Sequence, residues 1–323
     1  MVWRKVGKIF NPIEYKLSDG CVEFAQSPQT IVFDDRIRIY FSTRKKESNG
    51  KFLSYISFVD FDKELNSVID ISKKTVIPLG NIGCFDEHGI FPINPLKHNN
   101  QIVAYTCGWS RRVSVSVETS IGYAISKDNG LTFEKTGDGP ILTSSLNEPF
   151  LVGDPFVSFF NNIYYMWYIY GKGWIRNNLS EVLERVYKIG YATSIDGINW
   201  TKQNIAIIPD RLNENECQAL PSVIKIGNYY LMAFCYRQAI DFRNNRDNAY
   251  RLGFAYSKDL INWVRDDEKF EIPMKENDWD TDMMCYPHLF QVNGRNYLLY
   301  NGNEFGRYGF GMAELIFNDF ESL

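Results

Sequence analysis

The sequence predicts an all-β fold, a five-bladed β-propeller with about four antiparallel strands in each blade. Three observations predict it. A hairpin-forming segment occurs five times along the 323 residues, its copies are almost equally spaced, and each carries a turn pair and an aromatic residue at matching positions. The five copies are SPQTIVFDDRIRIYFS, FPINPLKHNNQIVAYT, DPFVSFFNNIYYMWYI, LPSVIKIGNYYLMAFC and YPHLFQVNGRNYLLYN.

The spacing of the copies sets the size of the repeating unit. Each copy contains a proline, and successive prolines are 64, 63, 66 and 66 residues apart. The prolines are Pro28, Pro92, Pro155, Pro221 and Pro287. The turn pairs are Asp34-Asp35, Asn99-Asn100, Asn161-Asn162, Gly227-Asn228 and Asn293-Gly294, and the aromatic residues are Tyr40, Tyr105, Tyr168, Phe234 and Tyr300. A unit of this length holds about four strands, so residues 1–323 are expected to form a single five-bladed domain.

A second element repeats in the middle of the chain. The segments 121–133, 189–200 and 252–263 each read as a strand, a Ser-x-Asp turn and a terminal aromatic residue. We expect these turns on outer hairpins, with the aromatic residue packed between blades. The stretch LSEVLERVYK (179–188) has a pattern compatible with a helix, and we expect it to be a short excursion between the second and third strands of the third blade.

Composition narrows the class of partner. The net charge is −4 and no long basic run occurs, which argues against nucleic acid as the main partner. No segment reaches the roughly 18 apolar residues of a membrane span, and no signal peptide is apparent. The six cysteines show no CxxC pair, which favours a cytoplasmic protein with reduced thiols. Oligomeric state is left open.

No metal or cofactor is predicted. The three histidines, at 88, 98 and 288, lack the spacing of zinc ligands. Asp278, Asp280 and Asp282 alternate as in the opening of an EF-hand loop, but Met283 and Leu289 stand where that loop needs glycine and glutamate. A single calcium ion on the propeller axis stays an open alternative.

Carboxylates gather just before the repeated prolines. In a propeller the first strand of each blade lines the central axis, so the residues that precede the five prolines should share one end of the molecule. The residues five positions before the prolines are Glu23, Glu87, Phe150, Glu216 and Asp282, and those one position before are Ser27, Phe91, Asp154, Leu220 and Tyr286. A ring of carboxylates is costly unless it is solvated, paired or used. The candidate catalytic residues are therefore Asp154, Glu216, Glu87, Asp282 and Glu23.

Polar and aromatic residues near these carboxylates are candidates for binding a ligand. Arginines at the ends of second strands could pair with an anionic group or with the carboxylates. Flat aromatic faces next to hydrogen-bonding side chains suit a sugar ring. The candidate substrate-binding residues are Gln26, Arg44, Asp86, His88, Trp109, Arg237, His288, Asn301 and Asn303.

The pattern resembles the five-bladed β-propeller glycosidases, the superfamily that holds glycoside hydrolase families 43, 32 and 130. The repeat covers nearly the whole chain, and the segment 153–157, GDPFV, is similar to the Asp-Pro motif that carries the transition-state-stabilising carboxylate. The segments FDEHGIFP, WDTDMMCYP and YNGNEFGRYGFG resemble a branch associated with bacterial surface-polysaccharide synthesis. Two family carboxylates are missing: Ser27 stands at the position of the base or nucleophile, and Ala219 and Leu220 stand at that of the general acid.

The resemblance implies a carbohydrate-active enzyme and leaves three functions open. The first is a glycoside hydrolase whose acid and base come from the carboxylates named above. The second is a phosphorylase or glycosyltransferase that uses phosphate or a nucleotide sugar, with Arg44, Arg237, Arg111 or Arg112 binding the phosphate. The third is a carbohydrate-binding propeller without catalysis.

Overall fold

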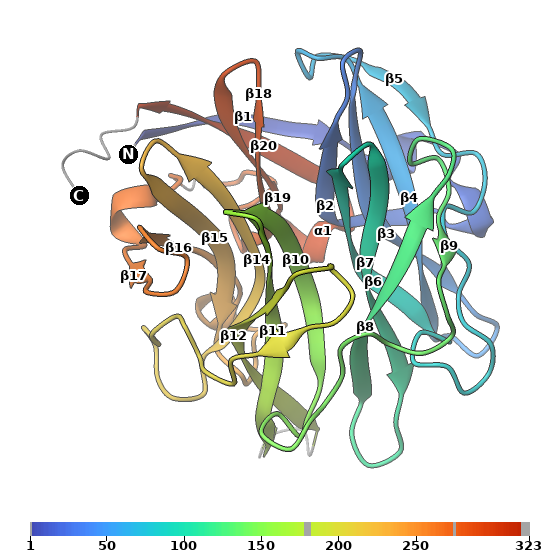
Figure 1. Ribbon diagram of the computed structural model, residues 1–323, viewed down its shortest axis with the longest axis vertical. Coiled ribbons are helices and arrows are strands. Elements are labelled where there is room, and N and C mark those ends of the chain that lie inside the picture. The colour runs from blue at the N-terminus through green and yellow to red at the C-terminus, as the bar shows by residue number, and fades with distance from the viewer. Residues whose placement is uncertain (1, 178–181, 274–275, 318–323) are drawn as a thin grey trace.

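The computed structural model describes residues 2–177, 182–273 and 276–317. Five four-stranded antiparallel units make up these residues, and Figure 1 shows them following one another around the molecule. The units of blades 1 and 2 count as one eight-stranded sheet because a single parallel pair, Ser54 with Gly89, joins them. The all-β propeller predicted from the repeats is confirmed.

The strands follow the repeats. Blade 1 consists of β2 (Glu23–Val32), β3 (Ile37–Lys46), β4 (Phe52–Phe61) and β5 (Val68–Ile71). Blade 2 consists of β6 (Gly89–His98), β7 (Gln101–Arg111), β8 (Val117–Ser126) and β9 (Glu134–Lys135). Blade 3 consists of β10 (Val152–Phe160), β11 (Ile163–Arg176), β12 (Leu183–Ser194) and β13 (Thr201–Lys202). Blade 4 consists of β14 (Cys217–Ile226), β15 (Tyr229–Arg237), β16 (Arg251–Ser257) and β17 (Val264–Arg265). Blade 5 consists of β18 (Cys285–Val292), β19 (Arg295–Asn301), β20 (Phe310–Phe317) and β1 (Val2–Phe10).

Helical structure is confined to single turns in the described residues. One α-turn, α1 (Asn303–Gly306), follows β19. Short 3₁₀ turns cover Pro12–Glu14, Ser18–Gly20, Arg246–Asn248 and Glu268–Phe270.

The first strands of the blades form the inner ring. Strands β2, β6, β10, β14 and β18 contact one another in that order, and β18 contacts β2 again, which closes the ring. Each of the five repeated prolines lies on one of these strands. The turn pairs that follow adopt left-handed backbone in blades 2, 3 and 5, because both central residues of a tight hairpin turn need positive φ. Asparagine and glycine tolerate that conformation, which explains the residues at Asn99-Asn100, Asn161-Asn162 and Asn293-Gly294.

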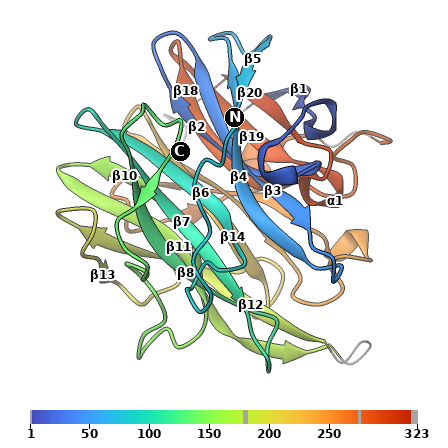
Figure 2. The same ribbon diagram turned by 90° about the vertical axis from the view of Figure 1, so that its right-hand side faces the viewer.

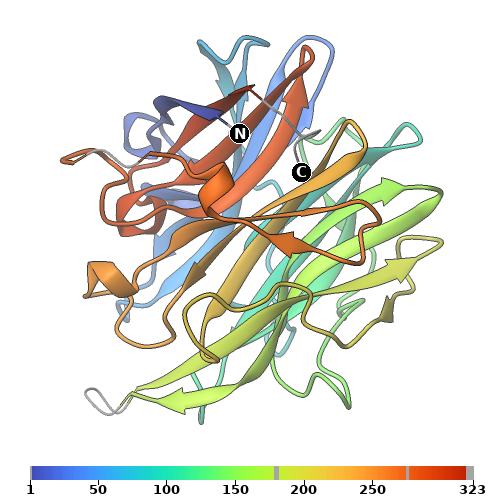
Figure 3. The same cartoon turned by 90° about the vertical axis from the view of Figure 1, so that its left-hand side faces the viewer.

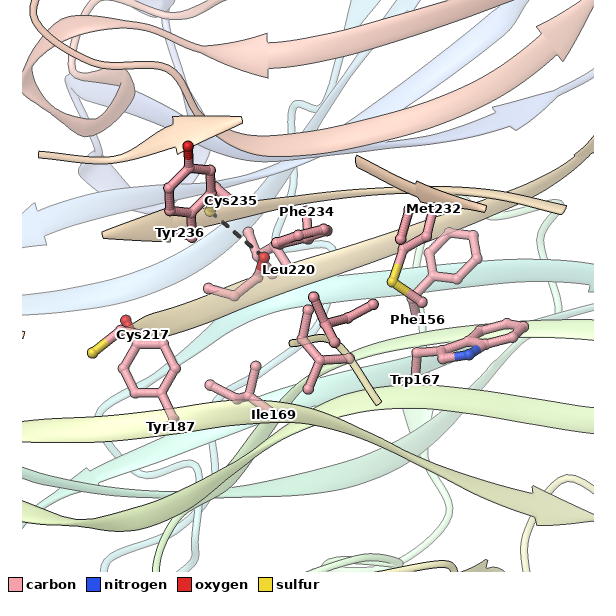
Figure 4. Packing of buried hydrophobic residues seen from close by; sticks show 14 of the residues in the cluster. Phe156, Trp167, Ile169, Tyr187, Cys217, Leu220, Met232, Phe234, Cys235 and Tyr236 are labelled. Atoms are coloured by element: carbon pink, nitrogen blue, oxygen red, sulfur yellow. Dashed lines mark hydrogen bonds between the residues drawn. The ribbon is translucent and has the colours of Figure 1, made fainter. Parts of the chain in front are cut away.

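The apolar core is divided into five clusters, one at each interface between neighbouring blades. Figure 4 shows the interface of blades 3 and 4, where Trp167 and Ile169 face Met232 and Phe234. The repeated second-strand aromatic residues lie in these clusters and are at most 1% exposed. Their burial between blades explains why the aromatic position repeats with the blade.

The Ser-x-Asp turns lie where the sequence predicts, on the hairpins that join the third and fourth strands of blades 2, 3 and 4. In two cases the turn also binds the preceding blade, since the Tyr40 hydroxyl donates to the Gly130 carbonyl at 2.6 Å and the Tyr105 hydroxyl donates to the Gly197 carbonyl at 2.9 Å. The turn is therefore both a hairpin end and a contact between blades.

The last blade is completed by the start of the chain. Strand β1 pairs with β20 as the outermost strand of blade 5, with Arg4 opposite Glu314. Figure 2 shows β1 beside β20, and Trp3 packs into the cluster between blades 4 and 5. Residues more than 300 positions apart thus share one sheet.

Blade 3 departs from the expectation in its second hairpin. The part of 179–188 that the structure describes as regular, from Leu183 onward, belongs to β12 and is not helical, while 179–181 lie outside the described residues. Pairing with β11 continues to Arg176 and Leu183, past a bulge between Gly171 and Gly173. Figure 3 shows this hairpin, in yellow-green, extending beyond the neighbouring strands. Cross-strand pairing overrides the helical pattern of this segment.

Candidate functional site

A bulge precedes the proline in each inner strand and turns one residue out of the regular pattern. The pairing with the second strand shifts register at this point in all five blades. The residue before the proline has φ of +49° to +56° in four blades, and in blade 2 the peptide bond before the proline is cis. These five residues, here called the axial ring, are Ser27, Phe91, Asp154, Leu220 and Tyr286.

The axial ring lies at the centre of the propeller. Blades 2 and 5 are not neighbours, yet the rings of Phe91 and Tyr286 pack edge to face with centroids 5.2 Å apart. Such a contact is possible only if both side chains reach toward the axis. The prediction that the residues before the prolines share one central place is met for the axial ring, and Asp154 is its one acidic member.

Asp154 is the buried carboxyl of this ring, with 7% of its surface exposed. Burial raises the pKa of the Asp154 carboxyl to about 7, while the Arg185 guanidinium and the backbone amide of Leu220 act in the opposite direction. The thiols of Cys107 and Cys235 lie close enough for the carboxylate to raise their pKa values, after the larger effect of burial. A carboxyl of this kind is part protonated at neutral pH and can give up a proton.

Other carboxylates before the prolines are held in a repeated buried ion pair. In blades 2 to 5 an acidic residue five to seven positions before the proline pairs with a lysine or arginine of the outermost strand of the same blade. The four pairs are Asp86–Lys135, Glu148–Lys202, Glu216–Arg265 and Asp280–Lys5. All four carboxylates are at most 1% exposed. Each ion pair connects the segment before the inner strand to the outermost strand of the same blade.

Two candidate site residues belong to these pairs, which corrects their expected place on the axis. Glu216 accepts from Arg265 at 2.6 Å, from Gln218 at 3.0 Å and from the backbone amides of Arg211 and Leu212. Both of its oxygens are thus occupied by partners of its own blade. Asp86 is likewise fully buried and pairs with a lysine of β9. Neither carboxylate is therefore free to act on a ligand at the axis.

Glu23, Gln26 and Arg44 lie together in blade 1, near the axial ring. The Arg44 guanidinium donates to the Gln26 side chain at 2.8 Å and stacks over Phe24 at 4.9 Å. Glu23 pairs with Arg307 at 2.9 Å and keeps 23% of its side chain exposed. Burial lowers the pKa of Arg44, Tyr286 opposes that change, and the positive charge of Arg243 adds to it. Two arginines from different blades thus act on each other beside Tyr286.

His88, Glu87 and Trp109 form a separate cluster at the rim of blades 1 and 2. The imidazole stacks on Trp109 with centroids 5.7 Å apart, and its Nδ1 lies 3.3 Å from Glu87. Glu87 also accepts from the backbone amide of Gly83. The Arg111 guanidinium lies over the Trp109 ring, 5.6 Å from its centroid, and pairs with Glu47. In the part of the chain that the structure describes, these side chains form hydrogen bonds and ring contacts with one another and none with the axial ring.

Asn301 and Asn303 stabilise the backbone of blade 5. Asn301 is fully buried, donates to the carbonyls of Ala25 and Gly309, and accepts from the amide of Ser27, each at 2.8 Å. Asn303 accepts from the amides of Asp282 and Met283. The Asp282 side chain is 60% exposed and lies 3.9 Å from Arg246.

Replacing Asn301 with alanine should lower the free energy of unfolding by roughly 2–4 kcal/mol, because it leaves two carbonyls and one amide buried without partners. Urea titration measures the loss. Asn296, on the same strand, is partly exposed and bonds Gln291 alone among the described residues, so Asn296→Ala should cost less than about 1 kcal/mol. Equal losses in the two variants would contradict this role for Asn301.

His288 lies one level below the axial ring and connects blades 5 and 1. Its Nε2 accepts from the backbone amide of Thr30 at 3.0 Å, so the neutral ring carries its proton on Nδ1. Burial lowers the pKa of this imidazole to about 3. Phe156 of blade 3 packs 6.1 Å away, which fills the axis beneath Asp154 with side chains. The Asn94 side chain likewise accepts from the backbone amide of Val157, and the Ser222 hydroxyl accepts from that of Leu289, each on the inner strand of the next blade.

Arg237 stands at the centre of an aromatic cluster next to the axial ring. Its guanidinium donates to the Tyr187 hydroxyl at 3.0 Å and stacks on Phe242 at 3.5 Å. The Tyr187 and Tyr250 hydroxyls are 2.6 Å apart, and Tyr250 packs against Tyr286 with centroids 5.6 Å apart. The cluster therefore continues from blade 3 through blade 4 to the axial ring.

Sequence reasoning missed several residues of this region. Arg185 acts on Asp154 from the extended β12, and Glu184 beside it pairs with Arg243 at 2.7 Å. Tyr187 and Tyr250 complete the aromatic cluster. No repeat marks them, because they lie on the third strand of blade 3 and on the loop of blade 4 that follows Arg237. The helical pattern of residues 179–188 also concealed the strand that carries Glu184 and Arg185.

The described residues contain no group of three or more His, Cys, Asp or Glu side chains that could hold a metal ion. Within the same described ranges, no helix is long and apolar enough to cross a membrane.

The fold is that of the propeller glycosidases and phosphorylases. The structure of a β-1,2-mannobiose phosphorylase from Listeria innocua superposes with a TM-score of 0.68 and 13% identity, covering 98% of this chain and 97% of that one. A thermostable family-43 glycoside hydrolase superposes with a TM-score of 0.64 and 14% identity, covering 94% of each chain. At this identity the similarity establishes the fold, and the expected superfamily resemblance is confirmed at that level.

The chain has relatives that are found by sequence. One, described as "Uncharacterized protein MT1551", is from Mycobacterium tuberculosis and is 30% identical over 322 residues, which is 98% of this chain and 99% of that one. The chain belongs to the family of that mycobacterial protein. A 1,2-β-oligomannan phosphorylase of Thermoanaerobacter is 28% identical over 117 residues, 36% of this chain and 35% of its own. No family model matches the chain.

Proposed function

We propose that this protein acts on a glycosidic bond, with Asp154 as the proton donor and with inorganic phosphate as the nucleophile. The observation that carries the proposal is the composition of the axial ring: one buried carboxyl with a pKa near 7, and no second carboxylate among its members. Hydrolysis of the usual kind needs a second carboxylate to activate water or to attack the sugar. An anionic nucleophile needs positive charge instead, and arginines lie around the ring.

The chemistry assigned to the site balances as follows. A phosphate oxygen attacks the anomeric carbon, the glycosidic C–O bond breaks, and the leaving oxygen takes the proton of Asp154. The products are a sugar 1-phosphate and a shortened saccharide, and the carboxylate regains its proton from solvent or from the next phosphate. Arg44, which is partly exposed, is the residue that would bind the anion.

The comparisons support this proposal without extending to its substrate. A phosphorylase is related in sequence over 117 residues, and a phosphorylase shares the fold over almost the whole chain. A cytoplasmic setting, which the sequence favours, would supply inorganic phosphate. Hydrolysis remains the second candidate because Glu23, although paired with Arg307, is partly exposed and close to Arg44.

The experiment uses the reverse reaction, which needs no knowledge of the natural saccharide. The protein is incubated with a panel of sugar 1-phosphates and acceptor sugars, and release of inorganic phosphate is measured. We expect release that depends on the acceptor and that falls about 10²–10⁴-fold in Asp154→Asn, because the variant has no proton to exchange. Asp34→Asn, in an exposed turn, is the control and should keep full activity.

Other outcomes would replace the proposal. Release of free sugar from β-1,2-linked mannosides without phosphate would identify a hydrolase. Saccharide binding without turnover in either direction would identify a binding module. Phosphate release that Asp154→Asn leaves unchanged would remove Asp154 from the reaction.

A further inference from the structure

Two arginines from neighbouring blades lie against the same phenyl ring, that of Phe24. Arg44 comes from β3 of blade 1, and its guanidinium carbon is 4.9 Å from the centroid of the ring. Arg307 follows α1 of blade 5, and its guanidinium carbon is 5.6 Å from the same centroid. Arg44 is partly exposed, and 38% of the Arg307 side chain is exposed. Two positive charges that solvent can reach therefore lie together where blade 5 meets blade 1.

Hydrogen bonds between the two blades hold this arrangement. The Phe24 amide donates to the Arg307 carbonyl at 3.1 Å, and the Gln26 side chain donates to the Phe305 carbonyl at 2.6 Å. The turn of α1 keeps its place although Glu304 and Phe305 both have positive φ, a conformation that residues with a side chain rarely adopt. The contacts with β2 thus fix the turn that presents Arg307.

The two arginines also lie beside the axial ring. Gln26, which accepts from Arg44 at 2.8 Å, directly precedes the blade 1 member of that ring. Phe305 packs against Tyr250 with centroids 6.2 Å apart. Tyr250 in turn packs against Tyr286, the blade 5 member of the ring, with centroids 5.6 Å apart. A group bound by the arginines would therefore be next to the place of the proposed reaction.

One of the two arginines already binds an anionic group of the protein, and the other has unpaired donors. Glu23 lies opposite Arg44 in the pairing of β2 with β3, but its carboxylate accepts from Arg307, at 2.9 Å and 3.2 Å. The Arg44 Nε donates to Gln26, whereas its Nη1 and Nη2 make no hydrogen bond or ion pair with any residue in the described ranges. Phosphate binds a guanidinium in the same two-pronged way as a carboxylate.

We propose that Arg44 and Arg307 form the binding site for the phosphate nucleophile, and that Glu23 occupies the Arg307 part of this site while it is empty. Phosphate takes the place of the Glu23 carboxylate on Arg307 and accepts from the unpaired nitrogens of Arg44. The carboxylate moves toward solvent, because it repels the bound anion. The inference rests on the proposed function, since the anion assigned to the site is the nucleophile of that reaction.

The test measures the binding of inorganic phosphate to the full chain by isothermal titration calorimetry, at pH 7.5 and at an ionic strength kept constant with sodium chloride. Arg44→Gln and Arg307→Gln should each weaken binding by roughly 10-fold or more, because each removes charged hydrogen-bond donors. Glu23→Gln should strengthen binding by about 3–10-fold, because the competing carboxylate is removed. Loss of folding cannot produce such a gain.

Two matched variants control for a general effect of charge. Glu47 is also in blade 1, pairs with Arg111 at 2.8 Å, and has 29% of its side chain exposed against 23% for Glu23. Arg295 is 63% exposed and begins β19, at the end of that strand remote from α1. Glu47→Gln and Arg295→Gln should each leave the affinity within about 2-fold of the unchanged protein, because salt screens distant exposed charges.

Failure of this inference can be distinguished from failure of the proposed function. An unchanged affinity in Arg307→Gln, no gain in Glu23→Gln, an equal gain in Glu47→Gln, or no phosphate binding at all would overturn the assigned site even if Asp154→Asn abolishes phosphate release. Full activity in Asp154→Asn would instead overturn the proposed function, whatever the affinities show.

Discussion

Replacing Glu216 with alanine is expected to lower the free energy of unfolding by about 3–5 kcal/mol. The substitution removes the carboxylate of a buried ion pair and leaves the Arg265 guanidinium and the amides of Arg211 and Leu212 without this acceptor. A buried charge or amide that loses its partner costs far more than an exposed one. Equilibrium unfolding in urea measures the change.

Asp282 provides the matched control for this prediction, because it stands the same five positions before its proline. Its side chain is 60% exposed and its nearest cation, Arg246, is 3.9 Å away. Asp282→Ala should therefore change the free energy of unfolding by no more than about 0.5 kcal/mol. A small loss in Glu216→Ala, comparable with that of Asp282→Ala, would show that the buried pair contributes little.

The second large effect concerns pH. The Asp154 carboxyl has a pKa of about 7 in the folded protein and 3.8 as its usual value, so the folded state binds the proton more tightly than the unfolded state. Stability contributed by this group is present below about pH 4 and is lost as the pH rises to about 7. At about 1.4 kcal/mol for each unit of pKa, the loss is about 4 kcal/mol.

Asp154→Asn isolates this contribution, because its side chain stays neutral at every pH while the other titrating groups are shared. We expect the two proteins to unfold at similar urea concentrations at pH 4.5, and the variant to be the more stable one at pH 8. The difference should grow through the interval between these values. A difference that does not change with pH would mean that the carboxyl titrates at its usual value.

The propeller could be predicted because the residues that repeat are the ones that the local backbone geometry requires. The asparagine and glycine pairs occupy turns with positive φ, and the buried aromatic residues fall once in each blade. Both features depend on neighbours close in sequence. The place of Asp154 was predictable for the same reason, since the bulge before each proline repeats with the strand.

The roles of Glu216 and Asp86 were not predictable in this way, because their partners lie about 50 residues further along the chain. A signal for those partners was nevertheless present. In blades 2 to 4 the cation follows the terminal aromatic residue of the outer hairpin by two positions, and Trp3 and Lys5 repeat that spacing in β1. The motifs are Phe133-x-Lys135, Trp200-x-Lys202, Trp263-x-Arg265 and Trp3-x-Lys5. Arg185 carried no such signal, since the hairpin that presents it occurs once.

The position of β1 has a consequence for how the chain acquires its structure during synthesis. This strand leaves the ribosome about 300 residues before β20, the strand it pairs with. Until then β1 has no strand to pair with, and the nascent chain carries an unpaired strand. Blades 1 to 4 can form in order of translation, but the circle closes only once β20 has left the ribosome. We therefore expect the nascent chain to depend on chaperones most strongly in this interval.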